Sequence, residues 1–137
     1  MRFCNSKRLY NLIYMQKCLR RIAEINLADT VYKRNEINIL RKELMDSILS
    51  ISLQNPHLAC YYSKFYQFLS QNEKKMEDLQ VVQENKLLFE ETKFNRLTEI
   101  KDDIVILEER ELDDENNQDN INQRILLNSV SHKFISS

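Results

Sequence analysis

The sequence predicts an all-α fold, a long antiparallel two-helix coiled-coil hairpin. Its 137 residues contain no glycine and one proline, and 42% of them are hydrophobic while 30% are charged. Glycine is the residue that tight turns, left-handed helix ends and β-bulges use. A chain that lacks it is expected to form long, uninterrupted helix, broken here once, at Asn55-Pro56.

The first helix is predicted over about residues 5–51, because apolar side chains recur there every three or four positions. That spacing is typical of a helix and close to the 3.5-residue repeat of a coiled-coil seam. We expect the register to slip between Thr30 and Asn35. The predicted stripe consists of Leu9, Leu12, Met15, Cys18 or Leu19, Ile22, Ile25, Ala28, Tyr32, Ile37, Leu40, Leu44, Ile48 and Ile51.

A hinge is predicted over residues 52–56. Asn55 is a good N-cap, and Pro56 stands at the first helical position, where a missing N–H costs nothing. Two amphipathic helices joined by a short connection are expected to fold back on each other, since each then covers the apolar stripe of the other.

The second helix is predicted over about residues 57–112, so that the hairpin forms one domain, 1–112. Residues 113–137 begin with a polar run of poor helix formers and are expected to be a partly disordered or frayed tail. The stripe of the second helix consists of Leu58, Tyr61, Phe65, Phe68 or Leu69, Asn72, Met76, Leu79, Val82, Phe89, Phe94, Leu97, Ile100, Ile104, Leu107 and Leu112.

Charge supports the same hairpin. If the chain reverses near residue 55, residue i faces roughly residue 110 − i. The first 23 residues carry six basic side chains and no acid, whereas the facing segment, 87–109, has a net charge of −4. Opposite blocks of charge favour this alignment, although each exposed pair contributes only ~0.2–1 kcal/mol. The basic residues are Arg2, Lys7, Arg8, Lys17, Arg20 and Arg21.

The sequence offers no catalytic constellation, and we expect neither an enzyme nor a cofactor. Phosphate loops, dinucleotide fingerprints and nucleophile elbows all require glycine. His57 and Cys60 lie three apart and could face one metal ion, but without a second pair a plain hinge histidine is expected. The acidic run could be imagined as a cation site, although a solvated helix face is the simpler interpretation. It consists of Glu108, Glu109, Glu111, Asp113, Asp114 and Glu115.

Nucleic acid and membrane are not expected as partners. The net charge is −1, and the apolar runs are far shorter than the ~20 residues that a membrane span requires. An odd number of cysteines, Cys4, Cys18 and Cys60, predicts a reducing compartment. A basic N-terminal segment could also be an organelle transit peptide, but its apolar positions continue in register into the next segment.

An aromatic cluster follows the hinge: Tyr61, Tyr62, Phe65, Tyr66 and Phe68. A helix with one partner buries only a narrow stripe, so several of these rings are expected to point outward. Exposed aromatic patches are typical of contact surfaces. The alternatives are that the rings thicken the packing near the hinge or that they meet a second copy of the chain.

This layout resembles the FliJ family of flagellar type III export, whose members are short, nearly glycine-free antiparallel helix pairs. The segment Tyr62-Ser63-Lys64-Phe65-Tyr66-Gln67-Phe68-Leu69 is similar to that family's aromatic stretch after the hinge. The resemblance implies a cytoplasmic stalk, peripherally associated with the inner-membrane export apparatus, that couples the export ATPase hexamer to the export gate and assists export chaperones. The stalk of a virulence-type injectisome is similar.

The resemblance also implies site residues. The membrane protein of the export gate would be contacted by Phe65, Leu69, Asn72 and Met76, and the basic N-terminal side chains would meet the ATPase ring. The competing interpretation is a generic coiled-coil scaffold, a homodimer that self-associates through its apolar stripes.

Overall fold

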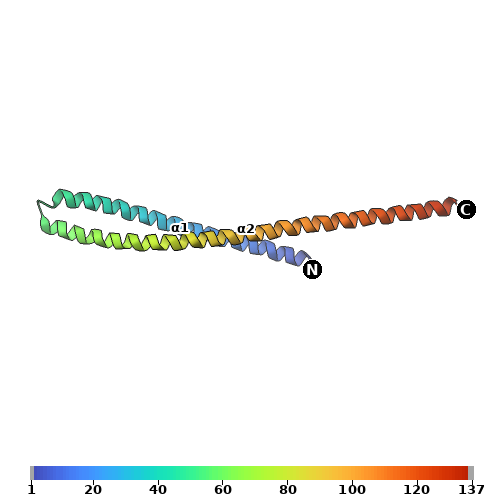
Figure 1. The fold of residues 1–137 in the computed structure, drawn as a ribbon, viewed down its shortest axis with the longest axis horizontal. Helices are drawn as coiled ribbons and strands as arrows, with labels where there is room; N and C mark the ends of the chain where they lie inside the picture. Colours follow the sequence, from blue (N-terminus) through green and yellow to red (C-terminus); the bar gives the residue numbers. More distant parts are fainter. Residues whose placement is uncertain (1, 136–137) are drawn as a thin grey trace. The chain divides into compact units, whose positions relative to one another are not determined.

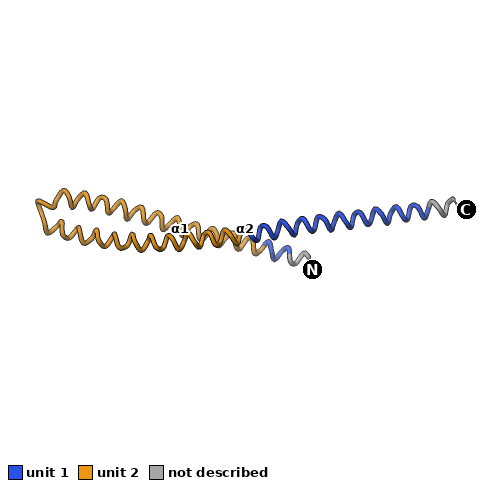
Figure 2. Tube along the Cα trace, in the orientation of Figure 1, with its two compact units in different colours: residues 1–10, 96–137 blue, residues 11–95 orange. Residues whose placement is uncertain are grey.

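The computed structural model describes the backbone of residues 2–135 and the side chains of residues 6–130. The chain forms two α-helices, α1 (Arg2–Ile51) and α2 (Pro56–Ile135), joined by residues 52–55 (Figure 1). The predicted all-α helical hairpin is therefore confirmed. Two compact units are present: residues 11–95, and residues 1–10 together with 96–137 (Figure 2).

The reversal is made without any left-handed residue, which explains why the chain manages without glycine. None of the described residues has a positive φ. The N–H of Asn55 donates to the carbonyl oxygen of Ile51 at 2.8 Å, and the Oδ1 of Asn55 accepts from the N–H of Leu58 at 3.1 Å. Asn55 thus caps α2, Pro56 is its first residue, and the chain turns where these two residues predict.

In the unit of residues 11–95 the two helices pack antiparallel along one regular seam (Figure 2). The seam residues of α1 are buried or half-buried and alternate in steps of three and four, which is the heptad pattern. They are Gln16, Arg20, Ala23, Leu27, Thr30, Arg34, Ile37, Arg41, Leu44, Ile48 and Ile51.

Each of these residues has a buried or half-buried counterpart on α2 at position 110 − i, so the observed register agrees with the register predicted from the position of the turn. In chain order the counterparts are Ala59, Tyr62, Tyr66, Leu69, Glu73, Met76, Gln80, Gln83, Leu87, Glu90 and Phe94. Contacts between the helices lie within four positions of this rule, as in Gln16 with Glu90 and Arg41 with Tyr66.

The predicted stripes are corrected over much of this unit. Leu12, Met15, Leu19 and Ile22 are exposed, because the partner helix lies over the row that begins one residue later. On α2 several predicted stripe residues are also exposed: Leu58, Tyr61, Phe65, Phe68, Leu79, Val82 and Phe89. Each helix carries two adjacent rows at helical spacing, and periodicity alone does not decide between them.

The expected slip between Thr30 and Asn35 is also wrong. The seam continues through Thr30, Arg34 and Ile37 in unbroken steps of four and three. Two of these seam positions, Thr30 and Arg34, hold polar side chains, so hydrophobicity alone does not identify them as part of the stripe.

The core of the hairpin is thin and partly polar. Its buried apolar residues, among those described, are Ala23, Ala59 and Leu69. Buried beside them are polar side chains, namely Gln16, Thr30, Glu73 and Glu90. Much apolar surface therefore stays outside the seam.

In the other unit, the start of α1 lies against the middle of α2. Ser6 Oγ donates to Glu108 Oε1 at 3.0 Å, and Lys101 Nζ lies 5.4 Å from the ring centroid of Tyr10. From residue 106 to residue 130 every side chain is exposed.

The predicted end of the second helix near 112 is wrong, because α2 continues to Ile135. Helical hydrogen bonds are local, from residue i to residue i − 4, so they do not require a neighbouring helix. Asn, Asp and Gln weaken a helix interior by less than about 0.7 kcal/mol each, and unlike proline they leave its hydrogen bonds in place.

Replacing the cap residue, Asn55→Ala, is expected to lower the stability of the hairpin by about 1 kcal/mol, because the N–H of Leu58 loses its acceptor. Thermal unfolding followed by circular dichroism measures the loss. Asn55→Asp keeps an acceptor at the same place and is expected to unfold close to the wild type. Equal melting temperatures for all three proteins would contradict the capping role.

Deleting residues 116–137 is expected to leave the melting temperature nearly unchanged, because the described side chains of this segment are all exposed. The helical signal at 222 nm should fall as helix is removed. A loss of several degrees in the melting temperature would show that this segment packs on the rest of the protein.

Candidate protein-binding surface

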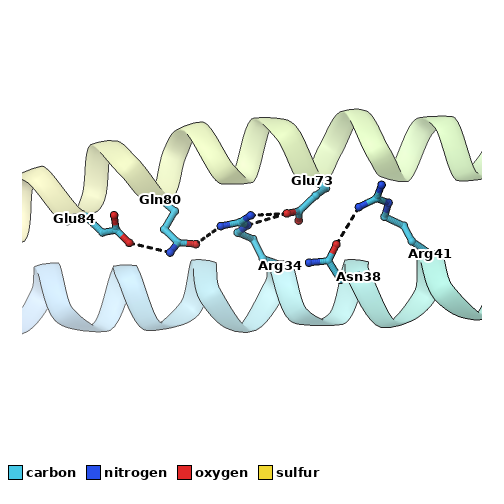
Figure 3. A network of polar contacts seen from close by, with 6 residues as sticks. All are labelled: Arg34, Asn38, Arg41, Glu73, Gln80 and Glu84. Atoms are coloured by element: carbon cyan, nitrogen blue, oxygen red, sulfur yellow. Dashed lines mark hydrogen bonds and ion pairs between the residues drawn. The ribbon is translucent and has the colours of Figure 1, made fainter.

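A polar network crosses the seam at Arg34 (Figure 3). The guanidinium of Arg34 donates to Glu73 Oε1 through Nε at 3.0 Å and through Nη2 at 2.6 Å. Its Nη1 donates to Gln80 Oε1 at 2.7 Å, and Gln80 Nε2 donates to Glu84 Oε1 at 2.9 Å. The hydrogen bond to Glu73 raises the pKa of Arg34, which strengthens the preference of its guanidinium for the charged form.

A second polar contact crosses the seam at Gln16. Its Nε2 donates to the carbonyl oxygen of Glu90 at 3.1 Å and also to the carboxylate of Glu90. Both side chains are buried, so moving one helix along the other would leave them without partners. Polar seam residues of this kind specify register more than they add stability.

Arg41 is a third polar residue of the seam, nearer the turn. Its Nη1 donates to Asn38 Oδ1 at 3.1 Å (Figure 3). Its guanidinium lies 5.2 Å from the ring centroid of Tyr66. Three of the eleven seam positions of α1 in this unit are therefore arginine: Arg20, Arg34 and Arg41.

The basic side chains near the N-terminus are placed in different ways. Arg20 is half-buried in the seam, where its guanidinium lies 4.4 Å from the ring centroid of Phe94 and its Nε lies 3.7 Å from Glu24 Oε1. The side chain of Arg2 lies outside the described residues. The remaining four are exposed: Lys7, Arg8, Lys17 and Arg21.

The aromatic cluster after the turn divides between the seam and the surface. Tyr62 and Tyr66 are half-buried in the seam. Tyr61, Phe65 and Phe68 are exposed at 68%, 41% and 55%, which confirms that several of these rings point outward. The rings of Phe65 and Phe68 stack, with centroids 6.4 Å apart and planes 15° apart.

The exposed rings belong to one row on α2, which we call the tip surface: Leu58, Tyr61, Phe65 and Phe68. Its steps of three, four and three place all four side chains on one helix face. Leu53, in the connection just before this row, is 96% exposed. The predicted stripe does not place Leu53 or Leu58 at the surface, whereas a heptad count starting at Ala59 places Leu58 there.

The four residues implied by the family resemblance do not share one exposed face. Phe65 is exposed, Leu69 is buried in the seam at 6% exposure, and Asn72 and Met76 are half-buried. Leu69 and Met76 occupy seam positions, so they hold the hairpin together. The exposed continuation of Phe65 is Phe68, one turn along the same face.

Other candidate sites remain plain surface. His57 and Cys60 are both exposed, and within the described chain no three His, Cys, Asp or Glu side chains gather as a metal site would require. A small hollow of about 50 Å³ beside Tyr10 and Lys101 has room for a water or two rather than for a substrate. None of the described helices is long and apolar enough to cross a membrane.

The comparisons with known proteins identify no relative: no family model, curated protein or solved structure matches the chain.

Leu69→Ala is expected to destabilise the hairpin by about 2 kcal/mol or more, because it removes one of the few buried apolar side chains. Phe65→Ala should change the melting temperature little, since Phe65 is exposed. Thermal unfolding of the two single variants measures the difference. If Phe65→Ala destabilised the protein as much as Leu69→Ala, the tip surface would be core rather than a contact surface.

Proposed function

We propose that this chain is a non-enzymatic helical hairpin that binds another protein through its tip surface. The observation that carries the proposal is the row Leu58, Tyr61, Phe65 and Phe68, which is exposed on one face of α2 beside the turn. Aromatic side chains are enriched in the anchors of protein interfaces and supply large contact area with few rotatable bonds.

The seam beneath the tip surface supports this role. Tyr62, Tyr66 and Leu69 hold the other faces of the same helical turns against α1. The tip residues are therefore presented on a helix whose orientation is fixed before binding, which reduces the entropy lost on association. A row with steps of three, four and three fits an apolar groove or an amphipathic helix of the partner.

Within this class, the more specific proposal is a stalk of type III protein export, in which the tip surface contacts the export-gate membrane protein. It rests on the aromatic segment 62–69 and on the helical-hairpin architecture. Exposed Phe65 supports it, whereas buried Leu69 limits the contact to Phe65 and its exposed neighbours. Lys7, Arg8, Lys17 and Arg21 would offer exposed positive charge to acidic groups of the export ATPase ring. Handling of export chaperones belongs to the same proposal.

A second candidate function, a scaffold that assembles with itself, is favoured by the exposed apolar residues of α1, such as Leu12, Met15, Leu19 and Ile22. It differs from the first in the surface used, because these residues do not belong to the tip surface.

The test is an affinity purification from the native cell, with mass spectrometry, of the wild type and of the double variant Phe65→Ser/Phe68→Ser. A partner that is recovered with the wild type and lost with the variant is expected. The matched control is Leu88→Ser, at an exposed apolar residue of α2 outside the tip surface, which should keep that partner. An export-gate protein in the lost fraction would support the stalk. Identical partners for wild type and double variant would refute binding through the tip.

A further inference from the structure

An apolar row on α1 stays exposed beside the seam. Leu12, Met15, Leu19 and Ile22 are exposed at 52%, 61%, 47% and 54%. They follow one another in steps of three and four, the same heptad spacing as the neighbouring seam. We propose that this row, which we call the α1 row, is the contact through which two copies of the chain form an antiparallel dimer.

The spacing of the α1 row makes it complementary to itself. Its steps of three, four and three read the same in both directions, with a centre at residue 17. When two copies lie antiparallel about a two-fold axis, Leu12 packs beside Ile22 of the second copy and Met15 beside its Leu19. Such an isologous contact closes at two copies and does not propagate.

The α1 row differs from the other exposed rows because the residues next to it on α1, on the side away from the seam, are uncharged. The next row outward from the seam consists of Asn11, Cys18 and Ile25, none of which carries a full charge at neutral pH. At about 100° per residue, Lys17 and Arg21 lie more than about 120° around the helix from the centre of the α1 row. The α1 helices of two copies can therefore approach through this row without placing like charges of α1 against each other.

The tip surface has the same spacing as the α1 row, but a charged residue lies next to it, so we assign it to another partner. Lys64 precedes Phe65 of the tip surface just as Cys18 precedes Leu19 of the α1 row. Two tip surfaces packed antiparallel would bring Lys64 against Lys64 of the second copy, which is unfavourable. The exposed row of α2 further from the turn is also interrupted, because Lys86 lies between Val82 and Phe89.

Cysteine placement provides a direct test. Cys18 is free and exposed, and it lies one residue from the proposed two-fold axis, so two copies bring their Cys18 thiols close together. In the variant C4S/C60S, a short bismaleimide is expected to join two copies. The matched control is C4S/C18S/C60S/K64C, whose one thiol lies beside the tip surface and is expected to stay unlinked. Crosslinking of the control with none through Cys18 would overturn the proposal in favour of a tip-to-tip dimer.

The second readout is the mass in solution by sedimentation equilibrium across a range of concentrations. The wild type is expected at twice its chain mass of 16.5 kDa, and Leu19→Glu should weaken the dimer by about a hundredfold or more, because it places a charge in the contact in both copies. Tyr14→Glu, an exposed residue outside the α1 row, should keep the dimer. A monomeric wild type at all concentrations, or an unchanged dimer for Leu19→Glu with retained helicity, would overturn the proposal. The variants differ from those that test the tip surface, so the two proposals can fail separately.

Discussion

The arrangement of this hairpin depends on polar side chains that occupy positions where a coiled coil usually places leucine or isoleucine. Arg34 is held between Glu73 and Gln80, and Gln16 is held by Glu90. A seam of uniform apolar residues can slide by a heptad at little cost, whereas a buried polar group that loses its partner costs about 1–3 kcal/mol. These pairs therefore choose one register, although buried ion pairs add little net stability compared with apolar packing.

The polar seam has a consequence for the surface. Because arginine, glutamine and glutamate occupy seam positions, much of the apolar content lies in neighbouring rows that face outward. Two of these rows, the tip surface and the α1 row, have the spacing that a further helix would need for packing. The polar residues inside the seam and the apolar surface outside it are therefore two sides of one sequence pattern. Exposed apolar surface of this kind ordinarily serves to bind other chains.

The sequence predicts some of this structure well. The absence of glycine predicts continuous helix, and Asn55-Pro56 predicts the turn, because capping and proline geometry are local properties. The rule 110 − i follows from the position of the turn alone. It agrees with the observed contacts to within four positions, because the axial register of an antiparallel pair is a single parameter and the position of the turn sets it approximately.

The choice of buried face could not be predicted in the same way. Hydrophobicity favours Leu12, Met15, Leu19 and Ile22, whereas the buried row is decided by hydrogen bonds between residues far apart in sequence, such as Gln16 and Glu90. The extension of α2 beyond residue 112 is also not predicted by propensity. The residues after 112 have low helix propensity, but none of them is a glycine or proline that would break the helix.

The register of the hairpin is tested most directly by distances between spin labels on its two helices. In a background without native cysteines, Gln67→Cys is paired in turn with Lys42→Cys, Asn35→Cys and Ala28→Cys, all at exposed positions. The labelled protein is diluted with unlabelled chain, so that only distances within one chain are read. The first pair is expected to give the shortest distance, and the other two should give increasing distances, because each step of seven residues adds about 10 Å along the helix. A shortest distance for the second or third pair would contradict the seam, and a long distance for all three would contradict the reversal itself.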